Sequence, residues 1–138
     1  PEAATGEASI RGLHILLAED NELNAEIAAR LLNDEGATVQ VVRDGQQAID
    51  AFASRPQGTY DAILMDIMMP KIDGYTATRV IRSTNRQDAK AIPIIAMTAH
   101  VFDEDVKQCL EAGMNAHLPK PLQMEKVVST IARLCRRK

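Results

Sequence analysis

Five polar residues that could act together in one chemical site stand at or just after the ends of short apolar segments. They carry three carboxyl groups, one hydroxyl group and one amino group, and they are Glu19, Asp20, Asp66, Thr98 and Lys120. Asp66 is the most informative, because it ends the apolar run at residues 62–65 and comes directly before a turn that contains Pro70. A carboxylate at the end of a buried strand is presented at the sheet edge where ligands collect in open α/β folds.

These residue types could together bind a metal ion and a phosphoryl group. Three carboxylates at one sheet edge repel each other, by about 4 kcal/mol per close pair at ~4 Å and an effective dielectric constant of about 20. A cation must offset this repulsion, and Mg²⁺ prefers oxygen ligands and often shares its site with a phosphate. The amino group of Lys120 and the hydroxyl of Thr98 can both bind phosphoryl oxygens. Asp66 could then be the nucleophile of a phosphoryl transfer, because a carboxylate is already ionised at neutral pH and needs no histidine as its base.

The elements that must bring these residues together are predicted from an alternation of two patterns. From His14 onward, short β-type apolar runs alternate five times with longer segments of helical period, which is typical of a parallel sheet covered on both faces. The expected strands are 14–18, 38–42, 62–66, 94–97 and 116–118. Right-handed crossovers make all five strands parallel, so the residues that end them emerge at the same edge. The fold class is therefore α/β, and the site is expected at that edge.

The helices between these strands are predicted from apolar stripes. In the first helix, Leu23, Ile27 and Leu31 recur every four residues and form one apolar stripe. Asp73 could cap the helix that follows the third strand, because its side chain can accept a hydrogen bond from a free backbone amide of the first turn. The last helix is expected to turn four residues inward, namely Val127, Val128, Ile131 and Leu134.

Composition limits the class of protein. The 138 residues are enough for one ordinary core, and 46% hydrophobic with 25% charged residues is typical of a soluble globular domain. No apolar stretch approaches the roughly 20 residues needed to cross a bilayer. The net charge of −3 gives no general attraction to nucleic acid. We therefore expect one soluble domain.

The two cysteines and the terminus give weaker indications. Cys109 and Cys135 have neither the spacing of a zinc motif nor that of a disulfide framework, which fits a reducing compartment. We expect a cytoplasmic location, within a parent protein that could itself be anchored in a membrane. Residues 1–12 are interpreted as a linker or an expression remnant, and residues 13–138 as the domain, with ordered structure expected to start near Leu13.

The ordered motifs resemble the receiver domain of two-component response regulators. The resemblance covers about residues 13–134, and its motifs occur in the family's order with family-like separations. They are Leu17-Ala18-Glu19-Asp20-Asn21, Leu64-Met65-Asp66-Ile67-Met68-Met69-Pro70, Asp73-Gly74, Met97-Thr98-Ala99 and Leu118-Pro119-Lys120-Pro121. Any one of them is a weak signal, whereas the ordered set is highly specific. The resemblance implies a flavodoxin-like (βα)5 fold, a three-layer sandwich whose five-stranded parallel sheet has the strand order 2-1-3-4-5.

The resemblance also implies a phosphoacceptor with a metal ion. Asp66 would accept a phosphoryl group from a histidine of a partner kinase or histidine phosphotransfer protein. Mg²⁺ would be bound by Asp20, Asp66 and the backbone carbonyl of Met68, with Glu19 acting directly or through water. Phosphorylation would then shift the domain between two conformations and so control a partner.

The same resemblance assigns the residues that hold and sense the phosphoryl group. Thr98 and Lys120 would hold its oxygens, and the bond to Pro121 would be the family's cis peptide. His117 occupies a position where the family commonly has an aromatic ring that moves inward together with Thr98. A histidine there could still switch or add pH dependence, although a packing role is the favoured interpretation. His100 lies at a position that influences the lifetime of the phosphoryl group in the family, and an exposed loop histidine is the alternative.

The resemblance extends to partners and output. The output face is expected on the last two helices and the strand between them. The linker-like start and Glu19-Asp20-Asn21 with Asn24 resemble receivers fused to hybrid histidine kinases, with a stand-alone regulator as the alternative. The domain is not expected to be an enzyme beyond its own phosphorylation and dephosphorylation, to bind nucleic acid or to contact a membrane, and a weak homodimer is possible.

Each motif also has a structural interpretation when it is taken alone. Glu19-Asp20-Asn21 could simply cap the first helix, and Asp66 could be a turn residue before Pro70. Lys120 could be a surface lysine. The methionines are expected to fill core and loop space, namely Met65, Met68, Met69 and Met97.

Two other functions fit the residues less well. A phosphatase of the haloacid dehalogenase type also uses an aspartyl nucleophile at a sheet edge. It needs a second acid two residues later, usually after the first strand, whereas Met68 has that place here and Asp66 follows the third strand. A nucleotide- or flavin-binding module would leave the acidic residues unexplained, and the chain has no G-x-G-x-x-G loop.

Overall fold

The computed structural model describes residues 9–99 and 103–135. Its centre is a five-stranded sheet in the order β2-β1-β3-β4-β5, in which every neighbouring pair is parallel. The strands are β1 (His14–Ala18), β2 (Thr38–Val42), β3 (Ala62–Asp66), β4 (Ile94–Thr98) and β5 (Ala116–Pro119). The predicted α/β class and strand order are confirmed, because each run of apolar and β-branched residues forms a strand where the sequence places it.

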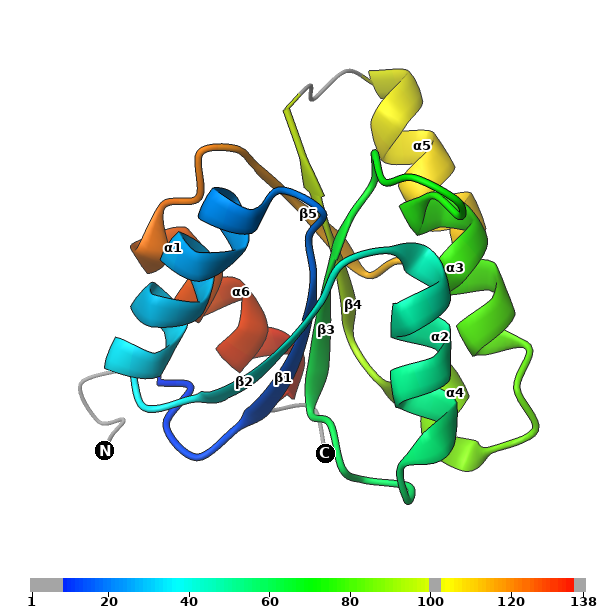
Figure 1. Ribbon diagram of the computed structural model, residues 1–138, viewed down its shortest axis with the longest axis horizontal. Coiled ribbons are helices and arrows are strands. Elements are labelled where there is room, and N and C mark those ends of the chain that lie inside the picture. Colours follow the sequence, from blue (N-terminus) through cyan, green and yellow to red (C-terminus); the bar gives the residue numbers. More distant parts are fainter. Residues whose placement is uncertain (1–8, 100–102, 136–138) are drawn as a thin grey trace.

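Helices cover both faces of this sheet. They are α1 (Glu22–Asp34), α2 (Gly45–Ser54), α3 (Gly74–Arg82), α4 (Gln87–Ala91), α5 (Asp103–Ala112) and α6 (Met124–Cys135). Figure 1 shows α1 and α6 on one face and the other four helices on the opposite face. The chain is thus a three-layer α/β/α sandwich, as the resemblance implies.

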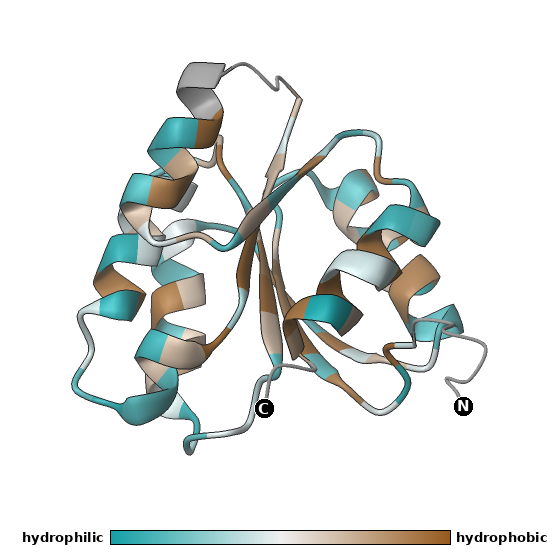
Figure 2. Ribbon diagram, turned by 180° about the vertical axis from the view of Figure 1, so that it is seen from behind, coloured by the Kyte–Doolittle hydropathy of each residue, from teal (hydrophilic) through white to brown (hydrophobic). Residues whose placement is uncertain are grey.

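Each face of the sheet has its own core, because successive side chains of a strand point to opposite faces. Leu16, Ile63 and Ile94 pack with α2, α3, α4 and α5, whereas their neighbours Leu17 and Leu64 pack with α1 and α6. Figure 2 shows the hydrophobic residues concentrated along the central strands, with hydrophobic and hydrophilic residues mixed along the helices. β3 is buried at all five positions and β4 at four of its five, so these two central strands are fixed from both sides.

The apolar stripe predicted for α1 is not the face that packs on the sheet. Leu23 is 63% exposed and Ile27 is 49% exposed, whereas the buried residues are Ala25, Ala28 and Leu32. Both sets fit a helical period, but the alanines let α1 approach the sheet closely. The stripe of larger side chains is therefore left facing outward.

The one-turn helix α4 and the first packed residue were not predicted. α4 is too short to show a periodic pattern, and the residue that anchors it in the core is Ala89, which is fully buried. Ile10 is also fully buried, in the same core as Ile15 and Leu32. The packed core therefore includes Ile10, three residues before Leu13. No helix in the described part of the chain has both the length and the apolar character to cross a membrane.

Candidate functional site

The strand order brings the predicted site residues to one edge of the sheet. Glu19 and Asp20 directly follow β1, and Asp66 ends the adjacent strand β3. Thr98 ends β4, where it is paired with Pro119 of β5, and its carbonyl accepts a 2.8 Å hydrogen bond from the backbone amide of Lys120. The predicted residues therefore meet at the carboxyl ends of four neighbouring strands. The most distant pair in sequence, Glu19 and Lys120, is 101 positions apart.

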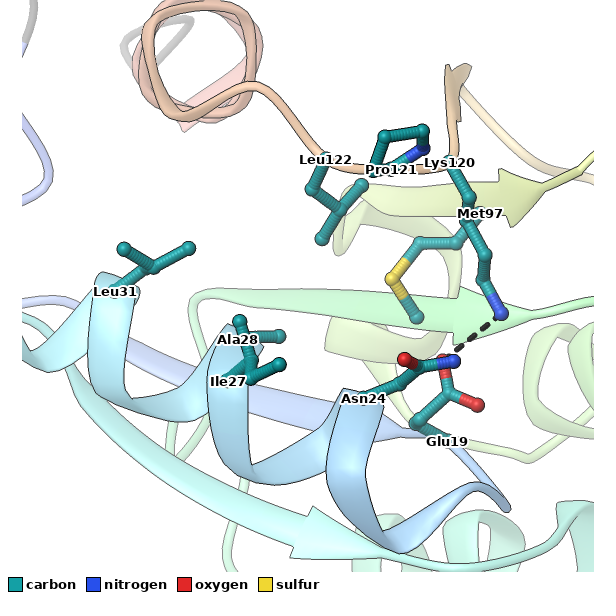
Figure 3. Close-up of a pocket in the computed structure, with 9 residues that line it drawn as sticks. All are labelled: Glu19, Asn24, Ile27, Ala28, Leu31, Met97, Lys120, Pro121 and Leu122. Carbon is teal, nitrogen blue, oxygen red and sulfur yellow. Dashed lines mark ion pairs between the residues drawn. The ribbon is translucent and has the colours of Figure 1, made fainter.

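Lys120 lies between two buried carboxylates. Its Nζ is 2.9 Å from Oε1 of Glu19 and 3.2 Å from Oδ1 of Asp66. Figure 3 shows the ion pair with Glu19 at the end of a groove beside α1. Glu19 is 3% exposed and Asp66 is 4% exposed, so these are short-range charge interactions that water screens only weakly. The interpretation of Lys120 as an ordinary surface lysine is therefore wrong.

Three carboxylates form a cluster that could hold a cation. Glu19, Asp20 and Asp66 each offer one oxygen, and these three oxygens lie within 4.8 Å of one another. Asp20 is exposed whereas the other two are buried, so the cluster is open on one side. A set of hard oxygen donors with an open side suits Mg²⁺, which keeps several of its own waters. The residues present therefore fit the ion that the resemblance implies.

The protein environment opposes the ionisation of Asp66. Burial, followed by the charge of Glu19, raises the pKa of Asp66 to about 7, although the charge of Lys120 and its hydrogen bond oppose that rise. Burial lowers the pKa of Lys120, but the hydrogen bonds and charges of Glu19 and Asp66 outweigh it, so the pKa is raised above its usual value. Lys120 thus stays cationic, and it offsets only part of the repulsion between the two acids.

Glu19 is already occupied by protein donors on both of its oxygens. Oε1 is paired with Lys120, and Oε2 accepts a 3.1 Å hydrogen bond from the backbone amide of Asn21. Asn21 in turn caps α1, because its Oδ1 accepts a 2.9 Å hydrogen bond from the amide of Asn24. The predicted capping of α1 is therefore confirmed, whereas the chemical role of this motif stays a prediction. In this arrangement Glu19 suits contact with a metal through water better than direct binding.

The loop between β3 and α3 lies directly beside Asp66. The amide of Gly74 donates a 2.8 Å hydrogen bond to the carbonyl of Ile67, and a Cβ at Gly74 would overlap the backbone carbonyl of Asp66. Asp73 caps α3 by accepting a 2.8 Å hydrogen bond from the amide of Thr76, so its predicted capping role is confirmed. Met68 is 79% exposed, which differs from the core or loop packing expected for it.

The other predicted site residues are placed as follows. The Lys120-Pro121 peptide is cis, as the resemblance implies. Thr98 is half-buried at the end of β4. His117 is half-buried on β5, paired with Ala96, and lines a hollow with residues of α5 and α6 away from the carboxylates. His100 lies outside the described residues.

An apolar groove next to the carboxylates was not predicted. It has a volume of about 360 Å³ and runs between α1 and the segment after β5. Ile27, Ala28 and Leu31 form one wall, and Pro121 and Leu122 lie opposite them (Figure 3). Part of the signal was present in the sequence, because Ile27 and Leu31 of the stripe on α1 border this groove.

Comparison with known families and proteins agrees with this architecture. The family model described as the response regulator receiver domain matches residues 15–132. Histidine kinase 1 of Arabidopsis thaliana is 38% identical over 93% of the chain, and the osmosensing histidine protein kinase of Saccharomyces cerevisiae is 36% identical over 98%. The chain spans only 13% and 11% of the lengths of these two relatives.

A solved structure shows the same likeness in three dimensions. The receiver domain of a sensor histidine kinase from Pseudomonas aeruginosa has a TM-score of 0.81 and 39% identity, over 91% of this chain and 98% of that one. That protein was crystallised with a magnesium ion coordinated in its active site cleft.

Proposed function

The chain belongs to the response regulator receiver domain family of two-component signalling, and we propose that Asp66 is the residue on which it accepts a phosphoryl group. The observation that carries this proposal is the contact between Asp66 and Lys120 within an acidic cluster at the sheet edge. The donor is a phosphohistidine of a histidine kinase or a histidine phosphotransfer protein. Acceptance of the group is the signal, and the domain acts as a substrate of its partner rather than as a turnover enzyme.

The transfer is a displacement at phosphorus. A carboxylate oxygen of Asp66 forms a bond to phosphorus while the bond from phosphorus to the histidine nitrogen breaks, and the electron pair of that bond leaves with the imidazole. Lys120 pairs with one of the phosphoryl oxygens, and the Thr98 hydroxyl donates a hydrogen bond to another. Because Lys120 is already held 3.2 Å from Asp66, its charge is in place before the donor arrives.

Mg²⁺ is the proposed cofactor, held by the carboxylates of Asp20 and Asp66 and by the carbonyl of Met68, with Glu19 acting through water. When bound, Mg²⁺ neutralises negative charge on phosphoryl oxygens and on the carboxylates. The raised pKa of Asp66, about 7, supports a need for such a cation, because an uncharged carboxyl is a poor nucleophile. Lys120 alone leaves that pKa high.

We further propose that the phosphodonor docks over α1. The exposed side chains of Leu23 and Ile27 and the groove beside Leu122 lie next to the carboxylate cluster. Met68 adds a 79% exposed side chain from the β3–α3 loop. A protein that brings a histidine to Asp66 must cover the surface around the carboxylate cluster, and residues that become well packed and desolvated near the centre of an interface contribute most to affinity.

The surface that controls a downstream partner is proposed to be a different one, made by α5, β5 and α6. Addition of a phosphoryl group puts roughly −1.5 to −2 charge at Asp66. Thr98 ends the strand that leads toward α5, so a change at its hydroxyl is passed to that part of the fold. His117 lies within this surface, where a packing role is favoured. The parent protein is proposed to be a hybrid histidine kinase, because the two relatives compared above are histidine kinases.

The acceptor is tested by phosphorylation with acetyl phosphate and Mg²⁺, followed by intact mass measurement. The wild type should gain one phosphoryl group, Asp66→Asn should gain none, and Asp50→Asn, which removes an exposed acid on α2, should behave as the wild type. Normal labelling of Asp66→Asn would exclude Asp66 as the acceptor.

The docking surface is tested with two donors. Ile27→Asp should slow transfer from a phosphorylated histidine phosphotransfer protein by about tenfold or more, which is the size of effect expected at an interface hot spot. The same variant should react with acetyl phosphate at the wild-type rate, because that small donor needs no docking surface. If Ile27→Asp and the wild type accept the phosphoryl group from the protein donor at equal rates, docking over this face of α1 is excluded.

A further inference from the structure

The β3–α3 loop contains a backbone conformation that its residue does not favour. Among residues 9–99 and 103–135, Lys71 is the one residue other than glycine with a positive φ, at 71°. A side chain with a Cβ makes this left-handed conformation unfavourable, so neighbouring contacts must maintain it. Lys71 lies three positions after Met68, whose carbonyl is a proposed metal ligand. Residues held in such conformations cluster at functional sites.

The first residue of α2 maintains one side of this loop. A Cβ at Gly45 would overlap the backbone carbonyl of Ile72 and lie 2.9 Å from the Cβ of Ile72. The loop backbone therefore rests directly on α2, at a distance that only glycine permits. The preceding residue, Asp44, is buried and lies 3.6 Å from Nζ of Lys71 through its Oδ2. Its other oxygen, Oδ1, accepts a 2.8 Å hydrogen bond from Gln47 and so fixes the start of α2.

The opposite side of the loop is fixed by the site strand itself. A Cβ at Gly74 would overlap the carbonyl of Asp66 and lie 2.9 Å from Cα of Ile67. Between these two close contacts, the amide of Ile72 donates a 2.8 Å hydrogen bond to the carbonyl of Pro70. The loop is thus held between the end of β3 and the start of α2, with the left-handed residue next to the α2 contact.

We propose that Gly45 and the left-handed backbone at Lys71 are positioning residues for the phosphoryl site, because they fix the path of the loop that presents the Met68 carbonyl. The inference rests on the proposed function, since it assigns a purpose to the geometry of a proposed metal ligand. Gly45 acts through Ile72, the residue that its Cβ position would meet. The side chain of Lys71 is 72% exposed, and its role is that of its backbone rather than of its charge.

The first test separates the backbone of Lys71 from its side chain. Lys71→Gly and Lys71→Val both remove the ion pair with Asp44, but glycine adopts a positive φ readily and a β-branched valine does not. The dissociation constant for Mg²⁺ is measured by calorimetry, after urea unfolding has shown that each variant is folded. Lys71→Val should weaken Mg²⁺ binding by about tenfold, the usual size of effect for groups that orient metal ligands, and Lys71→Gly by no more than about twofold.

Two outcomes of that measurement would overturn the proposal. Wild-type affinity in Lys71→Val would show that the loop path does not matter to the metal. Equal weakening in both variants would show that the side chain, and not the backbone, is responsible.

The second test follows the loop without any metal. Amide resonances of residues 67–74 are compared by NMR in the presence of a chelator. Gly45→Ala should shift them and also weaken Mg²⁺ binding, whereas Gly58→Ala should do neither. Gly58 is a control because nothing lies within 4 Å of its Cβ position, so that Gly58→Ala introduces only the backbone strain of a φ of 85° and no contact with the β3–α3 loop. Unchanged loop resonances in Gly45→Ala would refute the contact with α2. If Gly45→Ala does not fold, the Lys71 pair decides alone.

This design keeps the two proposals apart. If the wild-type protein itself does not bind Mg²⁺, the proposed function loses its metal site. If the wild type binds Mg²⁺ and the loop variants bind it equally well, only the positioning role fails.

Discussion

Asp66 is the residue whose charge depends most on its surroundings. Burial and the neighbouring Glu19 favour its neutral form, and Lys120 favours its charged form. The resulting pKa of about 7 means that Asp66, the proposed acceptor, is near the midpoint of its titration at neutral pH. A cation at the cluster would favour the charged form further, so binding of Mg²⁺ and ionisation of Asp66 should be coupled.

The raised pKa predicts how metal-free stability changes with pH. Between its ordinary value of 3.8 and about 7, Asp66 binds more proton in the folded state than in the unfolded state. Its contribution to the free energy of unfolding is therefore fully present below pH ~4 and is lost as the pH rises to about 7. Asp66→Asn should lack this loss, so in a chelator it should gain on the wild type between pH 5 and pH 8. Urea unfolding at pH 5 and at pH 8 measures the difference in free energy of unfolding between Asp66→Asn and the wild type. The same difference at both pH values would contradict the assigned pKa.

Thr78 is a second residue whose surroundings do not match its chemistry. It is fully buried in α3, and its hydroxyl has no hydrogen-bond partner. Thr78→Val keeps the shape and removes the cost of the buried hydroxyl, so the free energy of unfolding should rise by about 1 kcal/mol. Thr76→Val, at an exposed position of the same helix, should change it by less than about 0.5 kcal/mol. Thermal unfolding of the three proteins measures the effect, and a loss of stability in Thr78→Val would show that the hydroxyl is satisfied.

Among the elements, α1 has two apolar faces with different purposes. The face with Ala25 and Leu32 is buried, and the outer face carries Leu23 and also Ile27, which borders the groove. Leu32→Ala should therefore lower the free energy of unfolding by about 2–5 kcal/mol, as expected for a fully buried leucine. Leu23→Ala should change it by less than about 0.5 kcal/mol. Urea unfolding of both variants measures the contrast, and similar losses would mean that the outer stripe is structural.

Arg82 joins several elements at the edge opposite the site. Its guanidinium group donates hydrogen bonds of 2.8–3.0 Å to the carbonyls of Gly113, Ala89 and Ile92 and to Oδ1 of Asn115. These acceptors lie in α4, just after α5, and just before β4 and β5. One side chain at the end of α3 therefore fixes four neighbouring elements. Burial lowers the pKa of Arg82, but a guanidinium group remains protonated.

Replacement of the Arg82 guanidinium group should destabilise the protein more than the same replacement at an exposed arginine. Arg82→Lys cannot reach all four acceptors with one ammonium group, and the carbonyls left unpaired should reduce the free energy of unfolding by about 2 kcal/mol or more. Arg79→Lys, at an exposed position in the same helix turn, should have an effect below about 0.5 kcal/mol. Urea unfolding compares the two, and equal effects would show that Arg82 contributes only its charge.

At the scale of the whole molecule, the sheet is one structural unit with two cores and one reactive edge. Any ligand that binds only the folded edge must therefore stabilise the entire domain. Mg²⁺ at about 100 times its dissociation constant should raise the free energy of unfolding by about 2.7 kcal/mol. The increase should be lost in Asp66→Asn, and NaCl of equal ionic strength should not reproduce it. Unfolding curves with and without Mg²⁺ provide the measurement, and an equal increase in Asp66→Asn would place the ion elsewhere.

Much of the fold and of the candidate site could be predicted from local patterns. All five strands follow from short apolar or β-branched runs, and chirality then makes the sheet parallel and gathers the strand ends at one edge. Glu19, Asp66 and Lys120 could be selected because each stands where such a run ends. Asp73 could be assigned as a cap because capping depends on the three residues that follow it. These features are local in sequence, or follow from the handedness of the chain.

Tertiary packing decided the features that depend on distant neighbours. The inward face of α1 depends on how closely alanines approach the sheet, and α4 has no period to reveal it. The pairing of Lys120 with two acids depends on the order of strands, and the raised pKa of Asp66 depends on burial that sequence does not state. The left-handed Lys71 and the contact of Gly45 with Ile72 depend on the meeting of the β3–α3 loop with the start of α2. The sequence determined which groups this domain carries and at which strand ends they lie. The tertiary structure alone decided their distances, and with them their charges, because electrostatic and packing energies depend on separation in space rather than along the chain.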